Sequence, residues 1–163
     1  MYKRQTVDYM RPEGLDIVKR LIAKSDIFIE NNAYGVVQGL GLGYEEVRNM
    51  KPDIIMISMP GFGNSGPYRN RVALGRHLEC MAGHTLLRGY RDADPTWTTE
   101  VYHCDASAGG TAAFAALMGL HRRQRSGKGQ FIDVAQVETI IPQLSEFVLD
   151  YVCLLYTSPS PRD

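Results

Sequence analysis

The sequence lacks an excess of charge of either sign. Among its 163 residues, 18 lysines and arginines balance 18 aspartates and glutamates, so the formal net charge is zero. Proteins that bind nucleic acid through bulk charge carry a basic surplus, and we therefore expect no nucleic-acid partner. Hydrophobic residues make up 44% and aromatic residues 9% of the chain, which is typical of a folded globular domain and argues against a disordered tail.

The sequence also lacks long apolar runs and closely paired cysteines. No run approaches the roughly 18 residues of a transmembrane helix, and no signal-peptide pattern opens the chain, so we expect no membrane partner and no export. The three cysteines, Cys80, Cys104 and Cys153, show no C-x-x-C spacing. This favours a reducing compartment over a disulfide scaffold, and we expect a cytoplasmic protein.

The two ends of the chain do not resemble natural protein. Residues 153–163, CLLYTSPSPRD, are what one obtains by translating a DNA element that looks like the transposase mosaic end and adapter used in sequencing libraries. Residues 1–5, MYKRQ, fit the same element on the opposite strand, with GTG as the start codon. We therefore expect residues 1–5 and 153–163 to be adapter-derived, and residues 6–152 to be part of a longer protein.

Helical and strand patterns alternate along the remaining residues. Helical spacing predicts helices over 12–24, 44–49, 72–83, 106–124 and 135–151. Short apolar runs predict strands over 26–30, 53–59 and 130–134. The run over 53–59 is apolar throughout, as in a strand covered on both faces of a parallel sheet, so the pattern predicts an α/β fold with parallel strands.

Three finer expectations concern the predicted helices. Leu78 and Met81 are expected to face inward from helix 72–83. Helix 106–124 has apolar residues on nearly all sides, so we expect it to be buried all round. Pro142 is expected to kink or restart the last helix.

Gly61, Gly63 and Gly66 form a G-x-G-x-x-G pattern after a predicted strand, which is the spacing of a dinucleotide-binding loop. In that loop a helix opens at the third glycine, but here Pro67 follows at once. No acidic residue stands about 20 positions further on after a strand, since Glu79 comes too early. We therefore favour a rigid turn whose glycines supply positive φ, and expect no tightly bound cofactor.

Asp105 precedes a predicted helix of small residues that includes Gly109 and Gly110. The ordinary role of an aspartate there is to cap the helix. Alternatively, the helix N-terminus keeps the carboxylate ionised, and the small neighbours leave room for a bulky substrate. Such a carboxylate can attack an activated acyl group, so the residues alone leave a cap and a nucleophile both open.

The remaining polar residues give weaker evidence of a functional site. The histidines, His77, His84, His103 and His121, lack metal-ligand spacing, so we expect no metal site. Cys104 beside His103 has the composition of a thiol nucleophile and its base. Neighbouring side chains on a strand point to opposite faces, which argues against this pair.

Taken in order, the loop motifs resemble those of the family III CoA-transferases, also called the CaiB/BaiF family. The motifs are Glu30-Asn31, Gly41-Leu-Gly43-Tyr44-Glu45, Gly61-Phe-Gly63-x-x-Gly66-Pro67-Tyr68, Asp105-x-x-Ala108-Gly109 and Arg123-x-x-Ser126-Gly127-x-Gly129-Gln130. They span nearly all of residues 6–152. The resemblance implies a Rossmann-like α/β fragment of the large domain, and an interlocked homodimer in the full-length protein.

The same resemblance implies a reaction and two site residues. Coenzyme A, as a substrate, passes from an acyl-CoA donor to a carboxylic acid acceptor. The family's nucleophilic aspartate matches Asp105, which attacks the thioester to form an aspartyl anhydride and then an aspartyl-CoA thioester. The family's CoA-contacting asparagine matches Asn31, although Asn32 stands where the family usually has an aromatic residue.

Two alternatives remain open. An acyl-CoA racemase of the same family would use acid–base chemistry, with His103 or His121 as the partner of Asp105. A non-catalytic α/β scaffold module would use Asp105 only as a helix cap. Because the resemblance places the family's first strand and its closing glycine-rich loop outside residues 6–152, we expect the isolated chain to be poorly folded and inactive.

Overall fold

A computed structural model describes residues 6–90, 92–94, 97 and 102–154. Residues 1–5 and 155–163, most of the expected adapter-derived ends, lie outside this part. The described part is built on a three-stranded parallel sheet of β1 (Ile27–Glu30), β2 (Ile55–Ser58) and β3 (Gln130–Asp133), in that order. The carboxyl ends of all three strands therefore meet at one edge.

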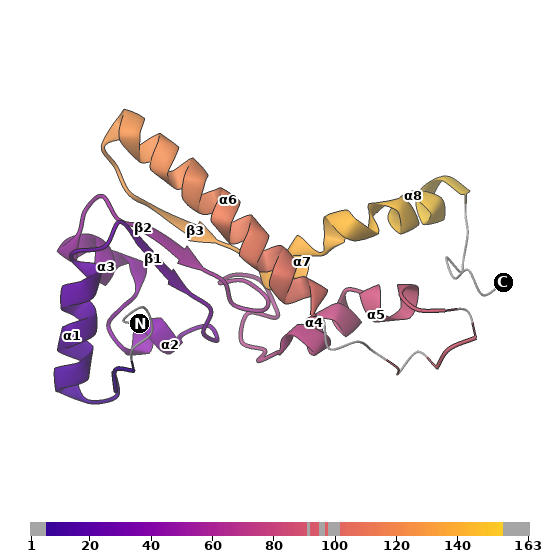
Figure 1. Cartoon of the computed structure of the whole chain (residues 1–163), viewed down its shortest axis with the longest axis horizontal. Helices are drawn as coiled ribbons and strands as arrows, with labels where there is room; N and C mark the ends of the chain where they lie inside the picture. Colours follow the sequence, from indigo (N-terminus) through magenta and orange to yellow (C-terminus); the bar gives the residue numbers. More distant parts are fainter. Residues whose placement is uncertain (1–5, 91, 95–96, 98–101, 155–163) are drawn as a thin grey trace.

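Helices cover both faces of the sheet and extend beyond it. In chain order they are α1 (Pro12–Ile22), α2 (Val36–Gly39), α3 (Tyr44–Met50), α4 (Gly75–Met81), α5 (His84–Leu87), α6 (His103–Ser126), α7 (Gln136–Thr139), the 3-10 helix η1 (Ile141–Leu144) and α8 (Ser145–Leu154). Figure 1 shows α6 running across the sheet, while α4–α5 and α7–α8 extend away from it. None of the helices in the described ranges is long and apolar enough to cross a membrane.

β2 lies at the centre of the sheet, and both of its faces are buried. On one face, Met56 packs with Val47 of α3. On the other, Ile55 and Ile57 pack with Ala112 of α6. Helices on each side remove the strand from water, which confirms the prediction made from its continuous apolar run.

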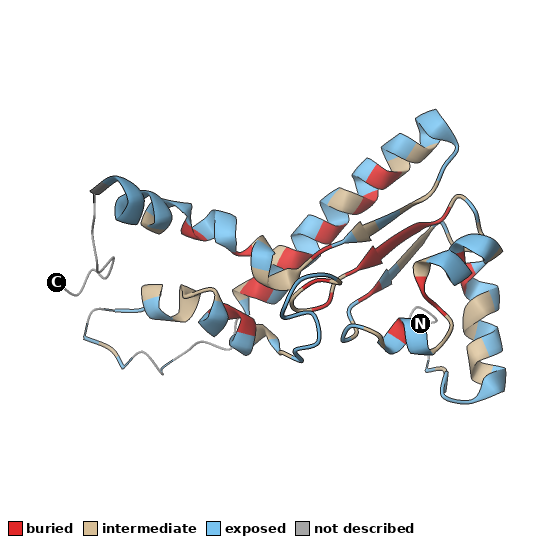
Figure 2. Ribbon diagram, turned by 180° about the vertical axis from the view of Figure 1, so that it is seen from behind, coloured by how far each residue is buried: buried red, intermediate tan, exposed pale blue. Residues whose placement is uncertain are grey.

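α6 is buried along one stripe only. The stripe consists of Cys104, Ala108, Ala112, Ala116 and Gly119. On other faces of α6, Phe114 and Leu117 are each 65% exposed, and Figure 2 shows the buried residues in red among exposed blue and intermediate tan residues. The expectation of burial on nearly all sides is therefore wrong, because the sheet packs on one face and no described element covers the rest.

α4, like α6, is buried on only part of its surface. Leu78 is buried, as expected, but Met81 is 57% exposed, so the expectation that it faces inward is wrong. Met81 is the last residue of this seven-residue helix, and the inward face ends with Leu78 and Glu79.

The final predicted helix is interrupted at Pro142. α7 ends at Thr139, η1 follows, and α8 begins at Ser145. Because proline has no N–H to donate within a helix, the chain restarts there, which confirms the prediction.

Candidate active site

A row of polar side chains closes the carboxyl edge of the sheet. Glu30, Ser58 and Asp133 end their strands at the same register position. The Ser58 hydroxyl donates to the Glu30 carboxylate, and the Asn64 side-chain amide donates to Ser58 Oγ and to Asp133 Oδ1, each at 2.9 Å. Asn64 belongs to the glycine-rich loop, so these bonds attach that loop to the sheet edge.

The glycine-rich loop is a turn and does not open a helix. Gly63 has φ 79° and Gly66 has φ 84°, which is the left-handed region that favours glycine. The next helix, α4, begins only at Gly75. The prediction of a turn with positive φ is thus confirmed at two of the three glycines, and the geometry of a dinucleotide-binding loop does not form.

Asp105 lies in the first turn of α6, two residues inside the helix. α6 begins at His103 with Tyr102 at the cap position, and no side-chain capping bond comes from Tyr102. The interpretation of Asp105 as the N-cap is therefore wrong in position. The helix starts earlier than predicted because Glu79, from α4, accepts hydrogen bonds from the His103 and Cys104 amides.

The Asp105 carboxylate is placed by the backbone of α4. A Cβ on Gly75 would lie 2.7 Å from Asp105 Oδ1, so any larger residue at position 75 would force the carboxylate to shift. Within the described part of the chain, the Asp105 carboxylate has no hydrogen-bond or ion-pair partner. Burial, and secondly the negative charge of Glu79, raise the pKa of Asp105 above its ordinary value.

Asp105 and Asn31 line one cavity of about 310 Å³. Asn31 directly follows β1, Met59 directly follows β2, and Gln136 opens α7 after β3, so three strand ends contribute to the same wall. Gly109 lies on the α6 side. The structure therefore brings the two predicted site residues together at the carboxyl edge of the sheet, where α/β proteins commonly bind ligands.

A second cavity, of about 390 Å³, adjoins the other side of Asp105. Arg76, His77 and Tyr102 line it, and the Arg76 guanidinium lies 5.9 Å from the centre of the Tyr102 ring. His77 Nδ1 accepts the Leu74 N–H at 3.1 Å. Arg76 is the lining residue that carries a permanent positive charge.

Cys104 has a structural environment. Its thiol donates to the Gln136 carbonyl at 3.1 Å. Burial raises the pKa of Cys104 to about 11, helped by the charges of Asp105 and Glu79. The thiolate needed for nucleophilic attack is therefore disfavoured. The sequence analysis also argued against this pair, on the ground that neighbouring side chains on a strand point to opposite faces. That ground does not apply, because Cys104 and His103 lie on a helix.

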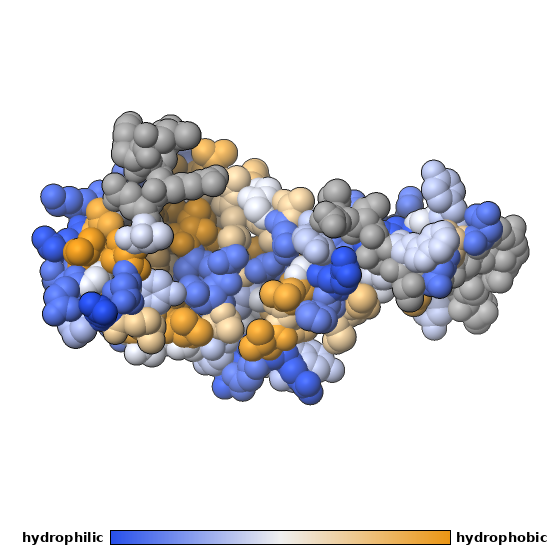
Figure 3. Space-filling view, turned by 60° about the horizontal axis from the view of Figure 1, so that its bottom comes forward, coloured by the Kyte–Doolittle hydropathy of each residue, from blue (hydrophilic) through white to orange (hydrophobic). Residues whose placement is uncertain are grey.

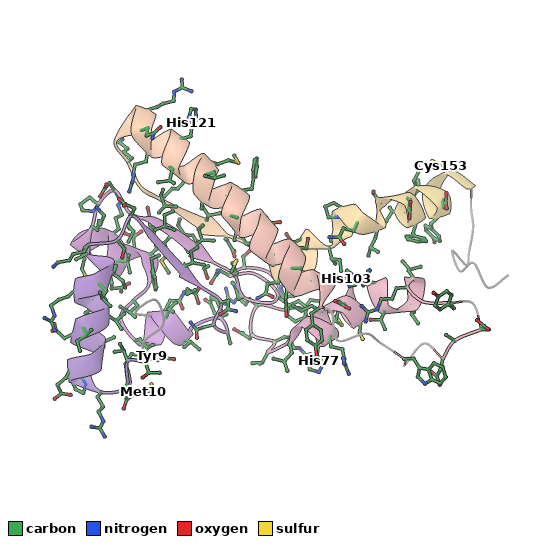
Figure 4. All side chains as sticks on the ribbon, viewed as in Figure 1. Tyr9, Met10, His77, His103, His121 and Cys153 are labelled. Carbon is green, nitrogen blue, oxygen red and sulfur yellow. The ribbon has the colours of Figure 1, made fainter. Side chains whose placement is uncertain are left out.

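The histidines proposed as acid–base partners are poorly placed. At about 1.5 Å per residue, His121 lies about 24 Å along α6 from Asp105, and Figure 4 shows it at the far end of the helix from His103. His103 is two residues before Asp105, a spacing at which helical side chains do not face each other. His103 Nδ1 lies 3.2 Å from Arg88 instead.

Sequence reasoning missed the buried cluster around Glu79. Glu79 has no exposed surface, and Arg88 Nη1 lies 3.0 Å from its Oε2. His84 Nδ1 lies 3.7 Å from the same oxygen. An acidic residue beside Leu78 on the inward face of a helix was the available signal, because a buried carboxylate requires partners.

Glu79, His84 and His103 also place possible metal-ligand atoms within 4.8 Å of one another. The Arg88 guanidinium lies within 3.2 Å of both Glu79 and His103. A metal ion there would face a permanent positive charge at short range, so the set does not favour a metal centre.

Comparison with known proteins gives consistent matches. Residues 3–163 match the family model described as CoA-transferase family III. A succinyl-CoA–D-citramalate CoA-transferase of Chloroflexus aurantiacus is 38% identical over 149 residues, which cover 91% of this chain and 37% of the relative. A succinyl-CoA:glutarate CoA-transferase of Mus musculus is 34% identical, covering 92% of this chain and 34% of the relative.

Solved structures show the same fold. A CAIB/BAIF family protein from Brucella suis matches with a TM-score of 0.87 and 32% identity, covering 95% of this chain and 41% of that protein. Rv3272 from M. tuberculosis matches with a TM-score of 0.80 at 23% identity, which supports the fold alone. The α/β prediction is confirmed, and the chain spans about two-fifths of the length of these proteins or less.

Proposed function

The chain belongs to CoA-transferase family III, and from that premise we propose that Asp105 forms a covalent intermediate in the transfer of coenzyme A from an acyl-CoA to a carboxylic acid. The chain spans 37% of its Chloroflexus relative, and the activity is proposed for the parent protein, meaning a protein of the relatives' length of which residues 6–152 are proposed to form part. One observation carries the proposal: the Asp105 carboxylate has no partner among the described residues and lines two cavities.

The reaction begins with attack by an Asp105 carboxylate oxygen on the thioester carbon of the donor. The carbon–sulfur bond breaks, coenzyme A leaves as a thiolate, and Asp105 holds the acyl group as a mixed anhydride. The thiolate then attacks the Asp105 carbonyl carbon, which releases the donor acid as a carboxylate. Asp105 is left as an aspartyl-CoA thioester.

The acceptor repeats these steps in reverse order. Its carboxylate attacks the Asp105 carbonyl carbon, releases the CoA thiolate and forms a second anhydride. The thiolate attacks the acceptor's carbonyl carbon, which gives the new acyl-CoA and restores the Asp105 carboxylate. In each step one anion displaces another, a carboxylate displacing the thiolate or the thiolate displacing a carboxylate. No proton therefore has to move, and no general base is required.

The surroundings of Asp105 favour the first attack. The N-terminus of the 24-residue helix α6 favours the ionised carboxylate and so opposes the rise in the pKa of Asp105 that burial and Glu79 cause. Gly75 keeps a side chain away from the reacting oxygens, and Gly109 leaves the α6 wall of the cavity open. Divided into steps through a covalent intermediate, the exchange avoids one direct and difficult displacement.

Asn31 and Arg76 are the proposed binding residues. Asn31 shares the cavity of about 310 Å³ with Asp105, and its amide can donate to and accept from coenzyme A. Arg76 lines the adjoining cavity, where its guanidinium offsets the repulsion between Asp105 and an anionic acid. This pairing supports a carboxylic acid as the second substrate.

The parent protein is also proposed to form a homodimer. Apolar side chains of α6 are exposed, including Phe114, Leu117 and Met118. They support the proposal that further protein surface covers this helix in the longer protein. Figure 3 shows further apolar patches on the surface of the sheet-bearing half.

Hydroxylamine trapping tests the proposed function. Hydroxylamine cleaves an aspartyl anhydride or thioester and leaves a hydroxamate, which peptide mass spectrometry locates. We expect the parent protein with succinyl-CoA to yield the hydroxamate at Asp105, and D16N, a change at an exposed aspartate of α1, to yield the same. Loss of the donor's α-hydrogen label without a hydroxamate or CoA transfer would instead indicate a racemase.

A further inference from the structure

We infer that Glu79 is a positioning residue for Asp105, because it holds the first turn of α6 from the neighbouring helix α4. This inference rests on the proposed function, since it assigns Glu79 a part in the reaction at Asp105. Glu79 is fully buried and lines neither of the two cavities at Asp105. It therefore acts on the backbone and not on a substrate.

The first contact is with the backbone of α6. The opening N–H groups of an α-helix have no partner within the helix. Glu79 Oε1 accepts the His103 N–H at 2.5 Å and the Cys104 N–H at 3.4 Å. Asp105 is the next residue, so the direction of its side chain depends on the turn that Glu79 holds.

The second contact balances the buried charge. Arg88 Nη1 lies 3.0 Å from Glu79 Oε2 and 3.2 Å from His103 Nδ1. Burial lowers the pKa of His84, which favours its neutral form, so Arg88 supplies the positive charge. The cluster thus links α4, the residue after α5, and the start of α6 around one carboxylate.

Gly75 and Glu79 lie one helical turn apart on α4 and face the same turn of α6. Gly75 gives the Asp105 carboxylate its room. Glu79 fixes the backbone that carries it, and its charge adds to the effect of burial on the pKa of Asp105. Removing Glu79 should therefore change both the rate and its dependence on pH.

The test compares three variants of the parent protein. E79A removes the acceptor and the charge, and we expect kcat to fall on the order of 10- to 100-fold, with KM for the acyl-CoA nearly unchanged. E79Q keeps an acceptor for the two amides, so it should recover much of kcat. E13Q, at an exposed glutamate of α1, is the matched control and should behave as wild type.

The pH profile separates positioning from a structural role. Without the charge of Glu79 the pKa of Asp105 falls, so the acid limb of kcat/KM in E79Q should move to lower pH. Hydrogen exchange should show weaker protection of the His103 and Cys104 amides in E79A.

Two results would overturn the inference: wild-type kcat in a folded E79A, or an unshifted acid limb in E79Q. If circular dichroism shows that E79A does not fold, the acid limb of E79Q alone decides. Failure of the proposed function is separate, because it would appear in the wild-type protein as the absence of a hydroxamate at Asp105.

Discussion

The backbone of Gly75 lies directly against the carboxylate of Asp105. A Cβ at Gly75 would be 2.7 Å from Oδ1 and 2.8 Å from Oδ2, closer than Cβ atoms approach such atoms in folded proteins. By contrast, a Cβ at Gly109 would meet nothing within 4 Å, although Gly109 lines the same cavity. The absence of a side chain at Gly75 is therefore what leaves room for the Asp105 carboxylate in this position.

Replacing Gly75 by alanine should displace the Asp105 carboxylate. We expect G75A to reduce kcat on the order of 10- to 100-fold, because small displacements of a reacting group cost rate steeply. Stability should fall by about 1–3 kcal/mol from the added methyl group. Initial rates and chemical denaturation of the parent protein measure the two effects.

The matched control is G39A, since a Cβ at Gly39 would meet nothing within 4 Å. It should retain wild-type kcat. Equal kcat values for G75A and G39A would show that the contact at Gly75 does not position the nucleophile.

Arg76 should affect binding of the acid more than chemistry. In R76Q the guanidinium that offsets the charge of Asp105 is lost, so KM for the acceptor acid should rise about tenfold while kcat changes little. Steady-state kinetics with varied acceptor measure this. R20Q, which alters an exposed ion pair with Asp16 on α1, serves as control, and identical KM values for the two variants would remove Arg76 from the site.

The buried thiol of Cys104 should couple stability to alkaline pH. The pKa of Cys104 is about 11 in the folded protein, against 9.0 for an ordinary thiol. The unfolded chain releases this proton first as pH rises, so the stabilising contribution is complete below about pH 9 and is lost towards about pH 11.

Urea denaturation of the parent protein at several pH values measures this coupling. C104A should lose this part of the alkaline decline in stability. C80A, at an exposed cysteine, should keep it. The same alkaline slope in wild type and C104A would contradict the assignment.

Residues 6–152 on their own should be inactive and poorly packed. The side chains of Phe114 and Leu117 on α6 are each 65% exposed, and the chain spans only 37% of its Chloroflexus relative and 41% of the Brucella structure. We expect light scattering to show self-association and a hydrophobic dye to bind. A monodisperse preparation with transferase activity would contradict this expectation.

Local sequence patterns predicted most of the fold because they act over short distances. The apolar run that contains Ile55 and Ile57 predicted a strand covered on both faces, and both side chains are buried. The exposed face of α6 was not predicted, since apolar composition at Phe114 does not say whether another element is present to cover it. Burial depends on partners outside the segment.

The candidate site depended on contacts that no local pattern contains. The start of α6 was placed too late because its capping oxygen comes from Glu79, on another helix. Asp105 was singled out from its place before a small-residue helix, Asn31 was chosen from the family resemblance, and the structure places both at one cavity. The contact between Gly75 and Asp105 could not be predicted from the sequence, because a glycine in a sequence does not show which atom lies beside it in the fold.

The central claim is that the Asp105 carboxylate carries the transferred group. The most direct measurement is the rate at which the parent protein incorporates isotopically labelled free acid into acyl-CoA, compared between wild type and D105N. Asparagine keeps the shape of the side chain but replaces the nucleophilic carboxylate with an amide. Exchange should therefore fall at least about 1,000-fold in a folded D105N. Exchange at the wild-type rate in D105N would contradict the account.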